Sequence, residues 1–219
     1  MHGTFLKHKP VAAIAMPFVF ALAFILSLGL SAPPAFAASP SEQFISDNVQ
    51  KGIAILNNTS LSKDQRRSQV RDLLLSITNL KWFADYSLGQ YRRTATPADL
   101  AAFEGAFKDY ALAIYQPYFN KYSGQTLQVT GSYSDPPDRT VVKTLMINPN
   151  KSGSKPYGLN FKVLNEGGRL AIIDLQDQDS GVWIGETMRD QITSQLGQNN
   201  GAFAPVIKAV RNKTEQLNK

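Results

Sequence analysis

Residues 157–175 read YGLNFKVLNEGGRLAIIDL, and this stretch decides the fold. It begins with large apolar side chains that alternate with small or polar ones, as in a β-strand that buries one face. The apolar positions are Tyr157, Leu159, Phe161 and Val163. Glu166-Gly167-Gly168 predicts a tight turn, because glycine adopts the positive φ angles that short hairpin loops need. A second apolar run, Leu170 to Leu175, completes an antiparallel hairpin.

Two further strands are expected before this hairpin. Thr126 to Tyr133 has a period of two, and Thr140 to Ile147 is rich in β-branched residues. The first strand is expected to place on one face Leu127, Val129, Gly131 and Tyr133. Asp135-Pro136-Pro137-Asp138 predicts the turn between the two strands, because proline lacks the N–H group that a continuing ladder needs. After a polar loop at 148–156, the hairpin follows, and the order predicts a four-stranded antiparallel meander.

Helical periodicity flanks the meander on both sides. The expected helices are 40–56, 62–77, 82–91 and 97–122 before the sheet, and 182–196 and 202–215 after it. Ser62 with Gln65 forms a capping-box pattern, and Thr96 before Pro97 has the order of a cap and a first helical residue. Strands grouped between helices predict an α+β fold. We expect N-terminal helices, a four-stranded antiparallel sheet, two C-terminal helices and an apolar cavity between sheet and helices.

The first 37 residues have the features of an export signal. Lys7 and Lys9 give a positive start, and Val11 to Leu30 is almost entirely apolar. Ala35-Phe36-Ala37 provides the small-x-small pattern at which such signals are cut. We therefore expect residues 1–37 to be a cleaved signal peptide and residues 38–219 to form a single domain.

The alternative for this segment is a retained membrane anchor. A run of about 20 apolar residues is long enough to span a bilayer. Pro17, Ser27 and Gly29 interrupt the run, however, and favour cleavage.

The mature chain has few of the side chains that commonly serve in catalysis or zinc binding. There is no cysteine, and the two histidines, His2 and His8, lie in the expected signal. This excludes zinc sites built on Cys or His, Ser-His-Asp triads and Cys-His nucleophiles. Lys7 and Lys9 are two of the 23 basic residues, so 21 bases and all 17 acids remain and the mature net charge is +4. This mild charge favours anionic partners such as phospholipid headgroups over nucleic acid.

The segment 97–122 carries many large apolar side chains. Spacings of three and four place on one broad face Phe103, Phe107, Tyr110 and Ile114. One interpretation is core packing against the sheet. The other is that so many rings cannot all close-pack in a small domain, so that some line a cavity for an apolar ligand. The spacing alone leaves both interpretations open.

A series of short motifs runs through nearly the whole mature chain. They are Tyr86-Ser87-Leu88-Gly89-Gln90-Tyr91, Ala95-Thr96-Pro97, Tyr118-Phe119-Asn120-Lys121-Tyr122-Ser123-Gly124-Gln125, Ile172-Ile173-Asp174-Leu175, Gly181-Val182 and Arg189-Asp190-Gln191-Ile192. Their order and spacing together resemble the MlaC family of periplasmic phospholipid-binding proteins, also called toluene-tolerance auxiliary proteins.

The resemblance implies a non-enzymatic carrier in the periplasm of a Gram-negative bacterium. Family members shuttle phospholipid between an outer-membrane lipoprotein complex and an inner-membrane ABC transporter with an MCE-domain component, which serves outer-membrane lipid asymmetry. The acyl chains lie in the cavity between sheet and helices, while the headgroup stays near solvent. We accordingly expect a monomer with phospholipid as its ligand and without cofactor, metal or nucleic acid.

Candidates for contact with the acyl chains come from the sheet and from the helices that face it. They are Leu88, Phe103, Phe107, Val129, Leu159, Phe161, Val163, Val182, Ile184, Met188 and Ile192. Phe161 is the best single candidate, and the flexible thioether of Met188 adapts to different chains. For each position the alternative is core packing. Arg189 is the candidate for the headgroup side, with an ion pair to a neighbouring acid as its alternative.

Three carboxylates, Asp174, Asp177 and Asp179, raise other possibilities. Counted from Asp177, positions five and twelve of a calcium loop fall on Gly181 and Met188, so the pattern does not match. A carboxylate-based hydrolase is a further alternative, but we interpret Asp174 as an acceptor for backbone donors where its strand ends. The remaining alternative is a non-carrier adaptor protein of a lipid or hopanoid export system, with the same fold and a filled core.

Overall fold

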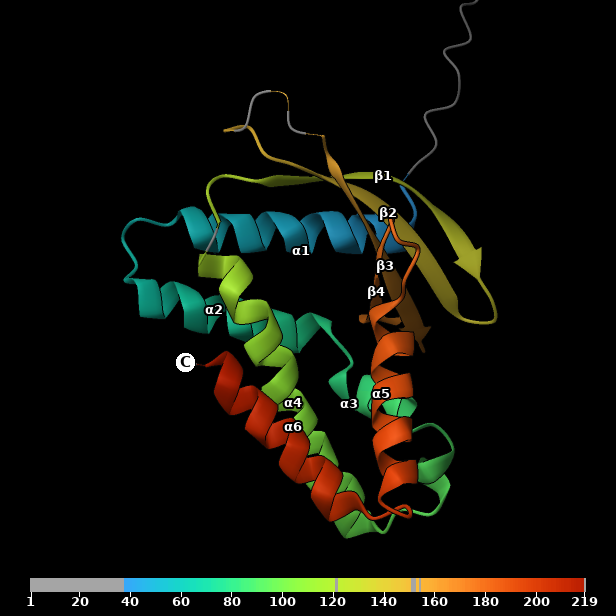
Figure 1. The fold of residues 1–219 in the computed structure, drawn as a ribbon. Coiled ribbons are helices and arrows are strands. Elements are labelled where there is room, and N and C mark those ends of the chain that lie inside the picture. The colour runs from blue at the N-terminus through green and yellow to red at the C-terminus, as the bar shows by residue number, and fades with distance from the viewer. Residues whose placement is uncertain (1–37, 121, 151–152, 154, 219) are drawn as a thin grey trace, which may run out of the picture. The chain divides into compact units, whose positions relative to one another are not determined.

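Four antiparallel strands form one sheet in chain order, β1-β2-β3-β4 (Figure 1). The computed structural model describes residues 38–120, 122–150, 153 and 155–218, with 115–120 as backbone only. The expected signal peptide, residues 1–37, lies outside these residues. The strands are β1 (Thr126–Asp135), β2 (Arg139–Ile147), β3 (Tyr157–Glu166) and β4 (Arg169–Asp177). The predicted meander is confirmed.

The turn between β3 and β4 follows the sequence prediction. Glu166 pairs with Arg169 across a two-residue loop. Gly167 and Gly168 both have positive φ angles, 60° and 90°, as the favoured two-residue hairpin turns require.

A β-bulge changes one prediction in β1. The pairing shifts between Val129, which lies opposite Thr144, and Gly131, which lies opposite Lys143. Since neighbouring residues of β2 point to opposite faces, Val129 and Gly131 do too. The expectation that Leu127, Val129, Gly131 and Tyr133 share a face is therefore wrong. Tyr133 instead shares a face with Lys143, whose ammonium lies 5.3 Å from the centre of the Tyr133 ring.

Seven helical segments flank the sheet among the described residues. Before it lie α1 (Pro40–Asn57), α2 (Lys63–Ile77), α3 (Leu80–Ser87), the 3₁₀ helix η1 (Gly89–Arg93) and α4 (Pro97–Asn120). After it lie α5 (Ile184–Gln198) and α6 (Phe203–Leu217). The α+β class is confirmed. The predicted helix at 82–91 divides into α3 and η1, where Gly89 has a φ of 54° that interrupts an α-helix.

Two helix starts were read correctly from their caps. The Ser62 hydroxyl accepts a hydrogen bond from Gln65 N, and the Gln65 side chain accepts one from Ser62 N. The Thr96 hydroxyl accepts from Asp99 N at 3.1 Å. Each cap satisfies backbone donors that the first turn of a helix leaves unpaired.

Below the sheet, α4 and α6 form one arm and α5 forms the other, whereas α1 and α2 run across these directions (Figure 1). α1 packs across β1 and β2, α4 and α6 lie side by side, and α5 descends from the end of β4. The two arms meet at the turn between α5 and α6. Among the described residues, no helix is both long enough and apolar enough to cross a membrane.

The buried apolar residues form two groups. The first, which we call the helical core, comes entirely from helices and their connections: Phe83, Ala84, Leu88, Phe103, Ala106, Phe107, Ala111, Met188, Ile192, Leu196, Phe203, Val206, Ile207 and Val210. The second, the sheet cluster, joins α1 to the sheet through four buried residues: Ile45, Val142, Val163 and Ile172. Seven partly buried residues pack against the sheet cluster: Phe44, Val49, Ile77, Val129, Phe161, Leu170 and Leu175.

Candidate functional site

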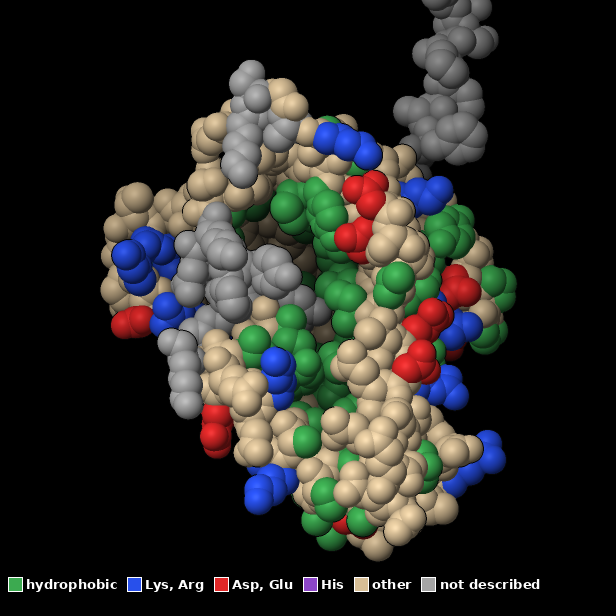
Figure 2. Space-filling model, viewed as in Figure 1, with side chains coloured by type: hydrophobic (Ala, Val, Ile, Leu, Met, Phe, Trp, Pro, Cys, Tyr) green, Lys and Arg blue, Asp and Glu red, His purple; other side chains and the backbone are tan. Residues whose placement is uncertain are grey.

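A hollow opens beneath the sheet on the face shown in Figure 2. It lies beside α5, below the sheet. Hydrophobic side chains gather around it and continue downward between α5 and the paired helices α4 and α6. The structure thus places an apolar depression where the sheet meets the two helical arms.

A groove lies between α4, α5 and α6. Its volume is about 430 Å³. Apolar side chains form its wall: Tyr110, Met188, Ile192, Ala209 and Val210. Polar side chains also line it: Gln191, Gln195, Asn212, Lys213 and Gln216. An apolar wall with polar groups beside it suits a ligand that has an apolar body and a polar end.

Tyr110 is the aromatic residue of this groove. Partial burial raises the pKa of its phenol above the ordinary value of 10.0. The hydroxyl therefore stays protonated at neutral pH and can donate a hydrogen bond to a ligand.

Three of the four sheet candidates belong to the sheet cluster. Val163 is fully buried, while Val129 and Phe161 are partly buried. Leu159 shares their face, because it lies opposite Thr144 as Val129 does, and it is also half-buried. Val129, Leu159 and Phe161 therefore retain surface that α1 does not cover.

Three of the candidates on the helices are fully buried. Leu88, Phe103 and Phe107 are at most 1 % exposed. The Phe107 ring packs 5.3 Å from that of Phe83 and 5.8 Å from that of Phe103, centre to centre. A side chain that lines a cavity keeps some accessible area, so in this structure these three residues fill a core between helices. They do not pack against the sheet, which was the other interpretation of their spacing.

The candidates on and before α5 divide along the helix. Met188 and Ile192 line the groove and are nearly buried. Ile184 is 36 % exposed, and Val182 is 50 % exposed and precedes the helix. The predicted helix start at Val182 is wrong because Gly181 and Val182 belong to the loop that follows β4.

Arg189 lies on a different flank of α5. Its guanidinium sits over the Tyr86 ring of α3, 5.2 Å from the ring centre. It also lines two shallow depressions together with Tyr86 and Gln90. The groove residues Met188 and Ile192 do not line either of them. The structure therefore separates the predicted headgroup residue from the groove.

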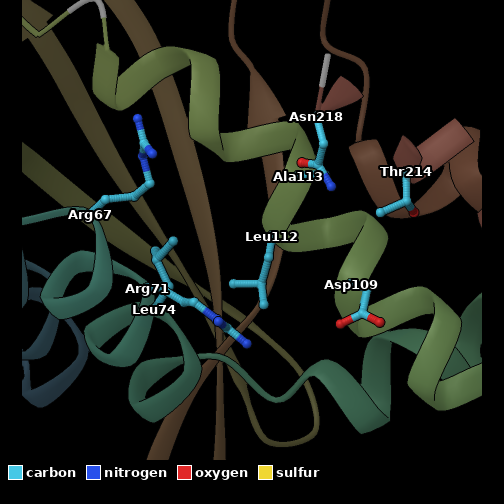
Figure 3. Close-up of a pocket in the computed structure, with 8 residues that line it drawn as sticks. All are labelled: Arg67, Arg71, Leu74, Asp109, Leu112, Ala113, Thr214 and Asn218. Atoms are coloured by element: carbon cyan, nitrogen blue, oxygen red, sulfur yellow. The ribbon is translucent and has the colours of Figure 1, made fainter. Parts of the chain in front are cut away.

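A second pocket, of about 340 Å³, lies between α2, α4 and α6 (Figure 3). Leu112 points from α4 toward Leu74 and Arg71 of α2. Arg67 also lines this pocket and forms an exposed ion pair with Asp64 at 3.3 Å. Charged side chains of both signs, Arg67, Arg71 and Asp109, line this pocket, so it does not suit an acyl chain.

Asp174 behaves as the sequence predicted. Its side chain is buried, and Oδ1 accepts hydrogen bonds from Leu175 N and Gly185 N, each at 2.8 Å. Burial raises the pKa of this carboxyl to about 6, against the opposing effect of both N–H groups and of Lys162. Asp177 faces solvent instead, where a hydrogen bond from the Tyr157 hydroxyl lowers its pKa.

Within the described residues, no group of three or more Asp, Glu, His or Cys side chains is placed to hold a metal ion.

Sequence reasoning missed the part that α6 plays. Val210 and Ala209 line the groove, and Phe203, Val206 and Ile207 belong to the helical core. The signal was present, since Phe203, Val206, Ile207 and Val210 recur at intervals of three and one along one helical face. What the pattern lacked was the partner helix, which only the fold supplies.

Comparisons with known proteins agree with this architecture. The family model described as MlaC protein matches residues 46–212. A solved structure of a phospholipid-binding protein from Ralstonia solanacearum, in complex with a phospholipid, has a similar fold, with a TM-score of 0.70. It is 17 % identical in sequence, and the match covers 83 % of this chain and 100 % of the other.

Proposed function

The chain belongs to the MlaC family, and from this premise we propose that it is a non-enzymatic periplasmic carrier of phospholipid. The hollow beneath the sheet and the groove between α4, α5 and α6 take the acyl chains. The observation that carries this proposal is the pairing of an apolar hollow beneath the sheet with an apolar-walled groove between α4, α5 and α6.

A carrier must compensate a large free-energy cost to hold acyl chains outside a bilayer. Each CH₂ group transferred from water to an apolar site is stabilised by about 0.8 kcal/mol. Two chains of about sixteen carbons therefore need well over 10 kcal/mol of compensating burial outside a bilayer. A continuous apolar surface, rather than a few polar contacts, is what supplies energy of this size.

We assign the contact with acyl chains to the candidates that retain surface. On the sheet these are Val129, Leu159 and Phe161; on α5 they are Met188 and Ile192. Tyr110 joins them on α4, where its protonated phenol can donate to a headgroup oxygen. Ile184 and Val182 extend this surface above the groove. Leu88, Phe103, Phe107 and Val163 support the walls from behind.

We also propose where and with which partners the protein acts in the cell. Residues 1–37 direct export and are removed, so that the protein diffuses freely through the periplasm. It works as a monomer between an outer-membrane lipoprotein complex and an inner-membrane ABC transporter with an MCE-domain component. These statements rest on membership of the family and on the signal pattern at Ala35-Phe36-Ala37.

Native mass spectrometry tests the binding of lipid. The full chain is expressed in a Gram-negative host, and the exported protein is purified and sprayed intact. We expect a mass increment equal to one phospholipid, identified after extraction. Phe161→Trp enlarges a half-buried ring and should lower the fraction of protein that carries lipid. Tyr133→Trp, on the opposite face of the sheet, should not. Protein without lipid, together with a Phe161→Trp variant that changes only stability, would favour the adaptor alternative.

A further inference from the structure

The first turn of α5 lacks a cap of its own. Its N-cap residue, Trp183, makes no side-chain hydrogen bond to the helix. The carboxylate of Asp174, on β4, accepts a hydrogen bond from Gly185 N instead. A backbone donor that a local cap would normally satisfy is thus satisfied by a buried side chain of the sheet. This contact fastens the upper end of α5 to β4.

The fit at this contact is close. A Cβ atom on Gly185 would lie 2.6 Å from Asp174 Oδ2, nearer than side chains approach one another. Gly185 lies on the buried face of α5, together with Met188 and Ile192. The contact is therefore one helical turn from the wall of the groove, and a shift of α5 at Gly185 would move that wall.

We propose that Asp174 is the positioning residue of α5: the hydrogen bond that it accepts from Gly185 N seats the helix against the sheet, and its buried charge keeps that seating weak enough for the groove to open. This inference rests on the proposed function, because an opening groove matters for a carrier that must load and release lipid.

The charges around Asp174 explain why the seating is weak. From β3, Lys162 faces the carboxyl and favours its ionised form; from α5, Glu186 opposes it. Lys162 is shared, since its ammonium also lies 3.4 Å from Asp135 and 4.1 Å from the ring centre of Trp183. The effect of burial outweighs that of Lys162 and the N–H groups, so the pKa is raised to about 6. At neutral pH the carboxyl is still ionised, although its site disfavours the charge.

The sign of the pH effect follows from proton linkage. With α5 seated, the pKa of Asp174 is about 6; with α5 moved away and the carboxyl in water, it returns toward 3.8. Between these values the seated state binds the extra proton, so raising the pH favours opening. Above about pH 6 the effect is constant. If opening exposes the carboxyl fully, the equilibrium constant for opening changes by about a hundredfold across this pH range. Each unit of pKa difference between the two states contributes about a factor of ten.

The sequence makes this effect measurable. Residues 38–219 contain no histidine and no cysteine, so no imidazole or thiol titrates near neutrality. With a pKa of about 6, Asp174 titrates closer to neutrality than an ordinary carboxyl does.

Lipid transfer at different pH values tests the proposal. The protein is loaded with a fluorescently labelled phospholipid and mixed with phosphatidylcholine vesicles, whose charge does not change between pH 4 and 8. We expect release to become faster, by several-fold up to about a hundredfold, from pH 4 to 6 and then to level off. Asp174→Asn keeps one acceptor oxygen and removes the charge, so its release should be slow and independent of pH. Asp190→Asn, an exposed acid on the same helix, should behave as the unmodified protein.

Hydrogen exchange of lipid-free protein provides a second measurement. After correction for intrinsic rates, the opening of peptides covering residues 184–198 should become easier from pH 4 to 6, and Asp174→Asn should abolish this step. A flat profile in the unmodified protein, or an unchanged step in Asp174→Asn, overturns the inference in either experiment. Failure to load lipid at any pH contradicts the proposed function instead, and hydrogen exchange then still decides the role of Asp174.

Discussion

The helical core and the sheet cluster are built from similar residues but are filled differently. The helical core has fourteen described residues that are buried and eight that are partly buried, whereas the sheet cluster has four and seven. Interlocked rings of Phe83, Phe103 and Phe107 close the first. Aromatic and aliphatic side chains of the second remain only partly buried around α1. The filled centre of the helical core holds the two arms in place, whereas the rim of that core at Met188 and Ile192 and the less filled sheet cluster leave apolar surface for a ligand.

The largest expected effect comes from emptying the filled region. Phe107→Ala removes a fully buried ring, which typically costs about 3–5 kcal/mol of unfolding free energy. Chemical denaturation followed by circular dichroism measures this loss. A cost below about 1 kcal/mol would mean that the helical core already contains a cavity, and the contrast between the two regions would disappear.

A smaller effect is expected where α5 meets the sheet. Gly185→Ala forces a methyl group against the Asp174 carboxylate and should cost about 1–3 kcal/mol. Gly105→Ala on α4 is the matched control, since nothing lies within 4 Å of its added Cβ. The control should be neutral or gain up to about 1 kcal/mol from better helix propensity. Equal losses in the two variants would show that the seating of α5 is not tight.

The unfilled region should respond differently from the filled one. Phe161→Ala removes a half-buried ring, so we expect a loss of only about 1–2 kcal/mol in stability. Lipid retention should fall much more than stability does, because the lost surface is the part that contacts the ligand. If the variant loses as much stability as Phe107→Ala and retains lipid normally, Phe161 is an ordinary core residue.

The smallest effect is expected at an exposed helix cap that belongs to neither region. Thr96→Ala removes the hydroxyl that accepts from Asp99 N at the start of α4, which costs about 1 kcal/mol. Thermal unfolding should shift slightly while lipid retention stays unchanged. A clear loss of retention would show that general weakening of the fold is enough to release lipid.

Local signals account for the parts that the sequence predicted correctly. The Gly167-Gly168 turn and the caps at Ser62 and Thr96 depend on neighbouring residues only, so their chemistry is visible in the chain. The alternation in β3 likewise identified the face that carries Phe161 and Val163.

Other features depend on partners distant in the chain. The bulge after Val129 appears in the pairing with β2, and Gly131, with a φ of 142°, is the one residue of β1 that could have indicated it. Phe103 and Phe107 have the spacing of any apolar helix face, so only the fold could show that helices, and not the sheet, cover them. The same holds for Arg189, whose position over Tyr86 depends on how α3 packs on α5.

Photo-crosslinking with a phospholipid that carries a diazirine on its acyl chain tests the central claim most directly. After irradiation and digestion, mass spectrometry locates the modified residues. The account predicts label at Leu159, Phe161, Tyr110, Met188 or Ile192, and none at Leu88, Phe103 or Phe107. Label concentrated on the last three residues, or no label above that of an unrelated exported protein, would contradict it.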